Sequence, residues 1–354
     1  MVRIIVIGDP HLRSDQMIMS RKLVNSLISK VSEIVPDAIV VLGDTLHTHD
    51  VVRIPASTLA YKLFLELSKI SQLIILVGNH DIMNNQVYLP DMEEPEHPFV
   101  SYKQWNNVIV CDKATVFEIG GIKFCGVPYV PNGSYTKAIE NVEVLEMGSF
   151  FSHQEFIGVK ANLKDEEGST KGDTWPENYP LNVCGHFHEA QILSKNLIYL
   201  GTPQQQNSGE SENKAIGLFT FKKEKTKDFQ KCGCIYYLYE RLELKDIIKR
   251  REYDISASDV EILRDICAFV ESNEIYMVKV VISGQPIEIS TIKKNRYYQQ
   301  LDENKRVCII CHAGKVINET FNNKTVKRKT FQDFLNEKLD EDDEVKEYFH
   351  SNFT

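Results

Sequence analysis

Several features are missing from this sequence of 354 residues. No apolar run approaches the roughly 20 residues that a membrane-spanning helix needs. The first residues, MVRIIVIGDPH, lack the small-residue cleavage site of a signal peptide. The eight cysteines are spread along the chain and do not form the dense framework of a disulfide-rich protein. We therefore expect an intracellular protein, cytoplasmic or nuclear, with reduced cysteines and no membrane segment.

An excess of positive charge is missing as well. The chain has 41 Lys and Arg against 50 Asp and Glu, which gives a formal net charge of −9 at pH 7. This balance argues against a protein coated in basic surface, although a local cationic groove or bound divalent metal ions could still attract an anion. The P-loop pattern G-x-x-x-x-G-K-[ST] is absent too, so any ATPase activity must belong to another chain.

Short apolar runs alternate with helical patterns in the first part of the chain. Apolar runs at 2–7, 37–42 and 73–77 are separated by helical patterns at about 20–34 and 55–70. Runs without polar alternation are typical of strands that are buried on both faces. This order of elements therefore predicts a parallel sheet covered by helices.

The pattern of predicted elements changes from about residue 107. Short strands joined by turns follow, with one helix predicted near 134–147 and a polar surface loop at 161–180. A mixed sheet, or two packed sheets flanked by helices, is the expected result.

A smaller α/β unit is predicted after about residue 245. Its pattern is a helix at 256–272, a strand at 276–283, a helix near 288–299 and a strand at 306–312. The chain is thus expected to have a large domain at 1–244, a smaller α/β domain at 245–328 and a helical tail at 329–354.

Each of the first three predicted strands is followed by a glycine and a cluster of polar residues. In open parallel sheets, ligands bind beyond the carboxyl ends of the strands. A turn that caps the next helix explains any single cluster, but three clusters in succession indicate a site. The clusters are GDPH with Asp9 and His11, GDTLH with Asp44 and His47, and GNHD with Asn79, His80 and Asp81.

Two further histidine motifs follow apolar runs. CGHFH contains His186 and His188, and FFSHQEF contains His153. Alternate residues of a strand point the same way, so an H-x-H pair is either ordinary surface or a pair of metal ligands. Together with the carboxylates and the amide, these imidazoles suit manganese, iron or zinc, and the thiolates of a structural zinc site are absent.

The ordered set D-x-H, GD, GNHD, an isolated histidine and GHxH resembles the calcineurin-like metallophosphoesterases over residues 8–188. The resemblance implies a layered α/β fold of mixed sheets flanked by helices, with two divalent metal ions at the strand ends. His80 would contact the phosphate and protonate or stabilise the leaving group, and Asp81 would either orient His80 or cap a helix. The implied ligands are Asp9, His11, Asp44 and His188 for the first metal, and Asp44, Asn79, His153 and His186 for the second.

Within this superfamily the chain resembles the double-strand-break repair nucleases of the MRE/SbcD type and their phage recombination relatives. The resemblance rests on the GD-x-x-H motif and on the Gly-Thr-Pro turn at 201–203, after the last metal motif. It rests also on the small α/β unit, which would be a capping domain. It implies a Mn²⁺-dependent DNA exonuclease and endonuclease in repair or recombination, in which His47 positions DNA phosphate. The segment QQQNSGE departs from the family pattern.

The same resemblance implies DNA, an SMC-like coiled-coil ATPase and a second copy of the chain as partners. The basic runs KKNRYY at 293–298 and KTVKRK at 324–329 are candidate DNA contacts or solvated surface, and the tail docks on a partner or packs on its own domain. A phosphatase or cyclic-nucleotide phosphodiesterase of small molecules is the alternative, and the net charge favours it. A scaffold without catalysis is disfavoured because every matched position is occupied.

Overall fold

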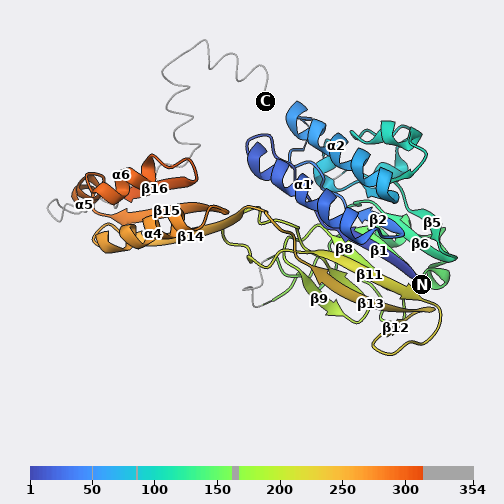
Figure 1. Cartoon of the computed structure of the whole chain (residues 1–354). Helices are drawn as coiled ribbons and strands as arrows, with labels where there is room; N and C mark the ends of the chain where they lie inside the picture. The colour runs from blue at the N-terminus through green and yellow to red at the C-terminus, as the bar shows by residue number, and fades with distance from the viewer. Residues whose placement is uncertain (50, 85–86, 162–166, 314–354) are drawn as a thin grey trace, which may run out of the picture. The chain divides into compact units, whose positions relative to one another are not determined.

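The computed structural model describes residues 1–49, 51–84, 87–161 and 167–313 (Figure 1). The expectations for the helical tail at 329–354 and for the second basic run lie outside the described residues. Within the described part of the chain, no helix combines the length and the apolar character that crossing a membrane requires.

A seven-stranded mixed sheet carries the predicted strand ends. Its parallel half is formed by the strands that the apolar runs predicted, and three later strands add an antiparallel half beyond the first strand. The strand order is β12 (Gln230–Cys232), β13 (Ile235–Leu242), β11 (Ile216–Lys222), β1 (Val2–Ile7), β2 (Ala38–Val41), β3 (Gln72–Leu76) and β4 (Val108–Cys111).

A second, six-stranded sheet supplies the remaining histidine motifs. Its four inner strands are parallel and its two edge strands, β5 and β9, are antiparallel to their neighbours. The strand order is β5 (Thr115–Ile119), β6 (Ile122–Val127), β7 (Ser149–His153), β8 (Leu181–Gly185), β10 (Leu197–Tyr199) and β9 (Gln191–Ser194).

The apolar run of β1 is explained by burial on both faces. Ile5 and Ile7 pack in one cluster with the helices α1 (Met17–Ile34) and α2 (Ile54–Ile70), which cover one face of the seven-stranded sheet (Figure 1). Ile4 and Val6 face the other way, into a cluster shared with the six-stranded sheet. Helices, sheet and sheet therefore form successive layers, which confirms the predicted fold class.

The C-terminal part of the described chain forms a separate hydrophobic cluster around a parallel three-stranded sheet. The sheet order is β14-β15-β16. The predicted α/β pattern is present, although the domain boundaries stay a prediction. The elements are β14 (Lys249–Ser256), α4 (Val260–Ser272), β15 (Tyr276–Gly284), α5 (Pro286–Ile292), α6 (Arg296–Asp302) and β16 (Val307–Ala313).

Two local predictions were wrong, and one strand was missed. The helix expected near 134–147 is only α3 (Tyr135–Ala138) and a separate 3₁₀ turn, because β-branched valines follow it and disfavour a helix. The helix near 288–299 is two helices, α5 and α6, since the Asn295 side chain accepts a bond from the Tyr297 N–H and starts a new one. Strand β14 was not predicted at all.

Candidate metal centre

The loops that follow β1 and β2 are paired with each other. The His11 N–H donates to the Asp44 carbonyl over 2.9 Å, and the Leu12 N–H donates to the Thr45 carbonyl over 2.8 Å. His11 and Asp44 both have positive φ, at 43° and 45°, a region that residues other than glycine adopt only when surrounding contacts impose it. The pairing of the loops is such a contact, and it brings the two polar clusters together.

Two of the glycines in the motifs are required because carboxylates lie against them. A Cβ atom at Gly78 would collide with the Asp44 carboxylate, and one at Gly185 would collide with the Asp9 carboxylate. The glycines that directly precede Asn79 and His186 therefore provide the space in which the acidic side chains lie.

Asp44 lies at the middle of the cluster and presents its two oxygens to different histidines. Oδ1 lies 3.3 Å from His153 Nε2, whereas Oδ2 lies 3.6 Å from His11 Nε2. All three side chains are buried. Each carboxylate oxygen thus belongs to a separate group of donor atoms.

The two histidines of the H-x-H motif separate in the same way. His186 Nδ1 lies 2.8 Å from Asn79 Oδ1, and His153 Nε2 lies 3.0 Å from the same oxygen. His188 instead points its Nε2 at His11 Nε2, 3.1 Å away. His186 and His188, which both follow the end of β8, therefore lie on different sides of Asp44.

The buried carboxylate and imidazole atoms of this cluster are better satisfied by metal ions than by hydrogen bonds to one another. Asp9 Oδ1 is buried without a hydrogen-bond partner among the described residues, although Asp9 Oδ2 accepts the His186 N–H over 2.8 Å. Burial raises the pKa of Asp9 to about 7. Burial alone would lower the pKa of His153, but the carboxylates of Asp44 and Asp9 outweigh it and raise that pKa to about 9. A dication would supply positive charge beside these buried carboxylates in place of the proton on His153, which would leave that imidazole free to act as a ligand.

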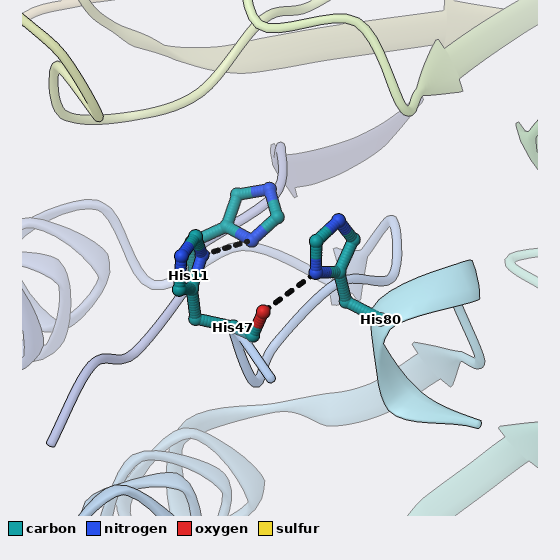
Figure 2. A group of neighbouring side chains, drawn as sticks. All are labelled: His11, His47 and His80. Carbon is teal, nitrogen blue, oxygen red and sulfur yellow. Dashed lines mark hydrogen bonds between the residues drawn. The ribbon is translucent and has the colours of Figure 1, made fainter. Parts of the chain in front are cut away.

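His47 and His80 lie beside His11 (Figure 2), and both are half-buried at the rim of this cluster. His80 Nδ1 donates to the His47 carbonyl over 2.6 Å, which leaves Nε2 turned toward Asp44 Oδ2 at 4.0 Å. His47 Nδ1 lies 3.4 Å from His11 Nδ1. Burial lowers the pKa of His80, and burial with nearby Arg13 lowers that of His47 to about 4.

Asp81 caps the turn that carries His80 rather than orienting the His80 ring. Its carboxylate accepts the N–H groups of Gly78, Thr45 and Leu46 over 3.1, 3.2 and 2.9 Å. Of the two roles left open by the sequence, the structure favours the cap. It also joins the loop after β3 to the loop after β2.

Sequence reasoning missed two polar groups that touch the cluster. Glu210 Oε1 lies 2.9 Å from His188 Nδ1, and the His49 ring lies 3.9 Å from the His80 ring between centroids. His49 was detectable as the second histidine of the sequence HTH. Glu210 lies in QQQNSGESENK, which offers neither a periodic pattern nor a known motif.

The comparison with protein families agrees with this arrangement. Residues 2–195 match the family model described as Calcineurin-like phosphoesterase, which is more than half of the chain. This chain belongs to the calcineurin-like phosphoesterase family. Members are phosphoric ester hydrolases that use divalent metal ions, and among the described residues the cluster around Asp44 could hold them.

Two viral proteins are similar over most of the chain. "Putative phosphoesterase 244L" of Invertebrate iridescent virus 6 is 30% identical over 297 residues, which cover 83% of this chain and 98% of that protein. "Putative phosphoesterase 078R" of Invertebrate iridescent virus 3 is 29% identical over 306 residues, which cover 85% of this chain and 82% of that protein. The similarity therefore extends beyond the family model into the C-terminal part.

Proposed function

We propose that this phosphoesterase is a DNA nuclease, with exonuclease and endonuclease activity, that acts in double-strand-break repair or recombination. The observation that carries the proposal is the position of His47. Its ring lies beside His11 and its carbonyl holds His80, so a further imidazole lines the rim next to the group that faces the centre. An imidazole at this position could contact a second phosphate of a nucleic-acid strand that extends beyond the cleaved bond.

The proposed ligand sets follow the two sides of Asp44. Carboxylate, amide and imidazole donors without thiolate suit Mn²⁺, which we propose as the metal. When bound, two such ions supply hydroxide near neutral pH and neutralise the phosphate. The sets are Asp9, His11, Asp44 and His188 for one ion, and Asp44, Asn79, His153 and His186 for the other.

His80 is the proposed proton donor to the leaving oxygen. Its Nδ1–H is committed to the His47 carbonyl, so only Nε2 can face a substrate. Burial lowers the pKa of His80, which makes its protonated form a stronger acid. The negative charge of a bound phosphate would favour that protonated form, and transfer of the proton to the leaving oxygen would then be favourable.

Proposed partners follow from the same role. DNA is the substrate, and an SMC-like coiled-coil ATPase would supply part of the DNA grip that a chain of net charge −9 lacks. A homodimer is proposed as well. The second candidate function is hydrolysis of small phosphoesters or cyclic phosphodiesters, which the acidic balance favours.

The test is degradation of end-labelled linear duplex DNA by the purified chain in Mn²⁺, Mg²⁺ or EDTA. We expect shortening from the ends in Mn²⁺, and its loss in EDTA and in His80→Asn. His312→Asn, which changes an exposed histidine on β16, is the matched control and should cleave normally. Intact DNA with hydrolysis of bis(p-nitrophenyl) phosphate, even after addition of an ATPase partner, would favour the second candidate.

A further inference from the structure

The segment 204–214, QQQNSGESENK, lies against the far side of the proposed ligand His188. His188 points Nε2 into the cluster, where His11 Nε2 is 3.1 Å away, and its Nδ1 lies 2.9 Å from Glu210 Oε1. A carboxylate at Nδ1 fixes that nitrogen as the donor and leaves the lone pair of Nε2 free for a metal. The Glu210 side chain is only 6% exposed, so water competes little for this contact.

Glu210 is itself held by several donors. Lys214 Nζ lies 2.9 Å from Glu210 Oε2, and the same ammonium donates to the His188 carbonyl over 2.8 Å. The Asn207 amide donates to Glu210 Oε1 over 2.9 Å, and the Gln206 N–H donates to Oε2 over 3.0 Å. Lys214 is as buried as Glu210, with 3% of its side chain exposed. These hydrogen bonds fix the position of the buried Glu210 carboxylate, and its contact with Nδ1 therefore fixes the orientation of the His188 ring.

The segment is also anchored to the first residues of β14. The Arg250 N–H donates to Gln205 Oε1 over 2.8 Å, and the Arg250 guanidinium donates to the Gln205 carbonyl over 3.3 Å. The Gln205 amide donates in turn to the Glu210 carbonyl over 2.9 Å. Hydrogen bonds therefore run from β14 through the segment to the histidine.

We propose that Glu210 is a positioning residue that sets the tautomer and orientation of His188, and that Gln205 ties this positioning to strand β14. The inference rests on the proposed function only in taking His188 as a metal ligand. It assigns a role to the part of the chain that matched no family pattern. Glu210 contacts His188 on its Nδ1 side, away from the Nε2 that faces the cluster, so its effect should be seen first in metal affinity.

The measurement is Mn²⁺ binding to the purified chain by isothermal titration calorimetry, together with thermal unfolding in EDTA. In Glu210→Ala we expect one of the two Mn²⁺ sites to weaken by about 10- to 100-fold. Glu210→Gln keeps an acceptor for the His188 N–H and should recover part of that loss. Gln205→Ala should weaken the same site by less than Glu210→Ala does.

Glu212→Gln is the matched control. Glu212 lies in the same segment, but its carboxylate pairs with Arg251 over 2.8 Å and accepts from the Tyr276 hydroxyl rather than contacting His188. We expect native Mn²⁺ affinity in this variant. In hydrolysis assays, added Mn²⁺ should restore the kcat of Glu210→Gln with KM for the substrate unchanged, a recovery that a merely misfolded variant would not give.

The outcomes separate this inference from the proposed function. Native Mn²⁺ affinity at both sites in Glu210→Ala and Glu210→Gln would overturn the inference and leave the ligand assignment standing. Equal weakening in Glu210→Gln and Glu212→Gln would overturn it as well, because it would indicate a general effect of the segment. No Mn²⁺ binding by the native chain would remove the ligand assignment and the inference together, whereas binding without DNA cleavage would remove the nuclease activity alone.

Discussion

The Nε2 atoms of His11 and His188 lie 3.1 Å apart, although 177 residues separate them in the chain. A hydrogen bond between the two Nε2 atoms would need one of them to carry the proton. However, His188 uses Nδ1 to pair with Glu210, and the Nδ1 of His11 faces the Nδ1 of His47. Two imidazole nitrogens that converge in this way, beside the Asp44 carboxylate, have the arrangement of ligands around an ion.

Metal binding should therefore stabilise the fold. At a free Mn²⁺ concentration of one hundred times the dissociation constant, a site gains about 2.7 kcal/mol of unfolding free energy. We expect Asp44→Asn to lose most of this gain, because Asp44 faces both groups of donors. Thermal unfolding with and without Mn²⁺ measures it, with Asp91→Asn at an exposed ion pair as control. An equal Mn²⁺ shift in native and Asp44→Asn protein would contradict the bridging role.

His47 should matter more for DNA than for a small substrate. Its ring is half-buried at the rim and faces His11, so it can contact a strand without being needed for a small phosphoester. We expect His47→Asn to lower kcat/KM for an oligonucleotide by about a hundredfold, because the DNA phosphate would no longer be held in the position that reaction requires. The value for bis(p-nitrophenyl) phosphate should fall by much less. Equal losses on both substrates would assign His47 to support of His11 instead.

How far the sequence predicts this molecule depends on the range of the interactions involved. Strand ends are local features, so the apolar runs and the glycine before each polar cluster placed Asp9, Asp44 and Asn79 near one another. The H-x-H motif by itself predicted only that His186 and His188 point the same way, and the family resemblance assigned one to each metal. In the structure His186 contacts Asn79 and His188 faces His11, on the two sides of Asp44. Their backbone explains it, because His186 has a φ of 81° and has left the strand conformation.

The partners that sequence reasoning missed are held by tertiary packing alone. Glu210 is a charged residue in a polar stretch, where exposure is the usual expectation. It is buried because Lys214 and His188 lie beside it, and no spacing in the sequence encodes that contact. Strand β14 was missed for a related reason, since its charged residues give no apolar run and pairing with β15 makes it a strand.

Asp112 should link stability to pH away from the metal centre. Its carboxylate is buried, and hydrogen bonds from His97 and Lys103 outweigh the burial and lower its pKa to about 2. Because the pKa in the folded state lies below the usual 3.8, its contribution is full above about pH 4 and is lost as pH falls through about 2.

We expect Asp112→Asn to lower the unfolding free energy by about 1–3 kcal/mol at pH 7. The difference from the native chain should shrink toward pH 2. Urea unfolding at a series of pH values measures both effects. A difference that stayed constant over this range would mean that Asp112 acts through packing rather than charge.

Arg13 and Arg53 should contact DNA phosphates. Both line a cavity of about 570 Å³ beside His47, which Ser14 also lines with a buried hydroxyl that has no hydrogen-bond partner among the described residues. Arg53 precedes α2, whose first turn has neither an acidic residue nor a side-chain cap, so the helix dipole adds positive potential there. Asp15 offsets part of this charge by pairing with Arg13 over 2.8 Å.

The measurement is the salt dependence of binding to single-stranded DNA. Each lost phosphate contact lowers the slope of log K against log salt concentration by about 0.7. We expect that change for Arg53→Gln and Arg13→Gln, and tighter binding for Asp15→Asn because it removes the opposing charge. Lys227→Gln, which removes an exposed charge between β11 and β12, should keep the native slope. Native slopes in both arginine variants would place the DNA elsewhere on the protein, since Arg13 and Arg53 are the basic side chains among the residues that line this cavity.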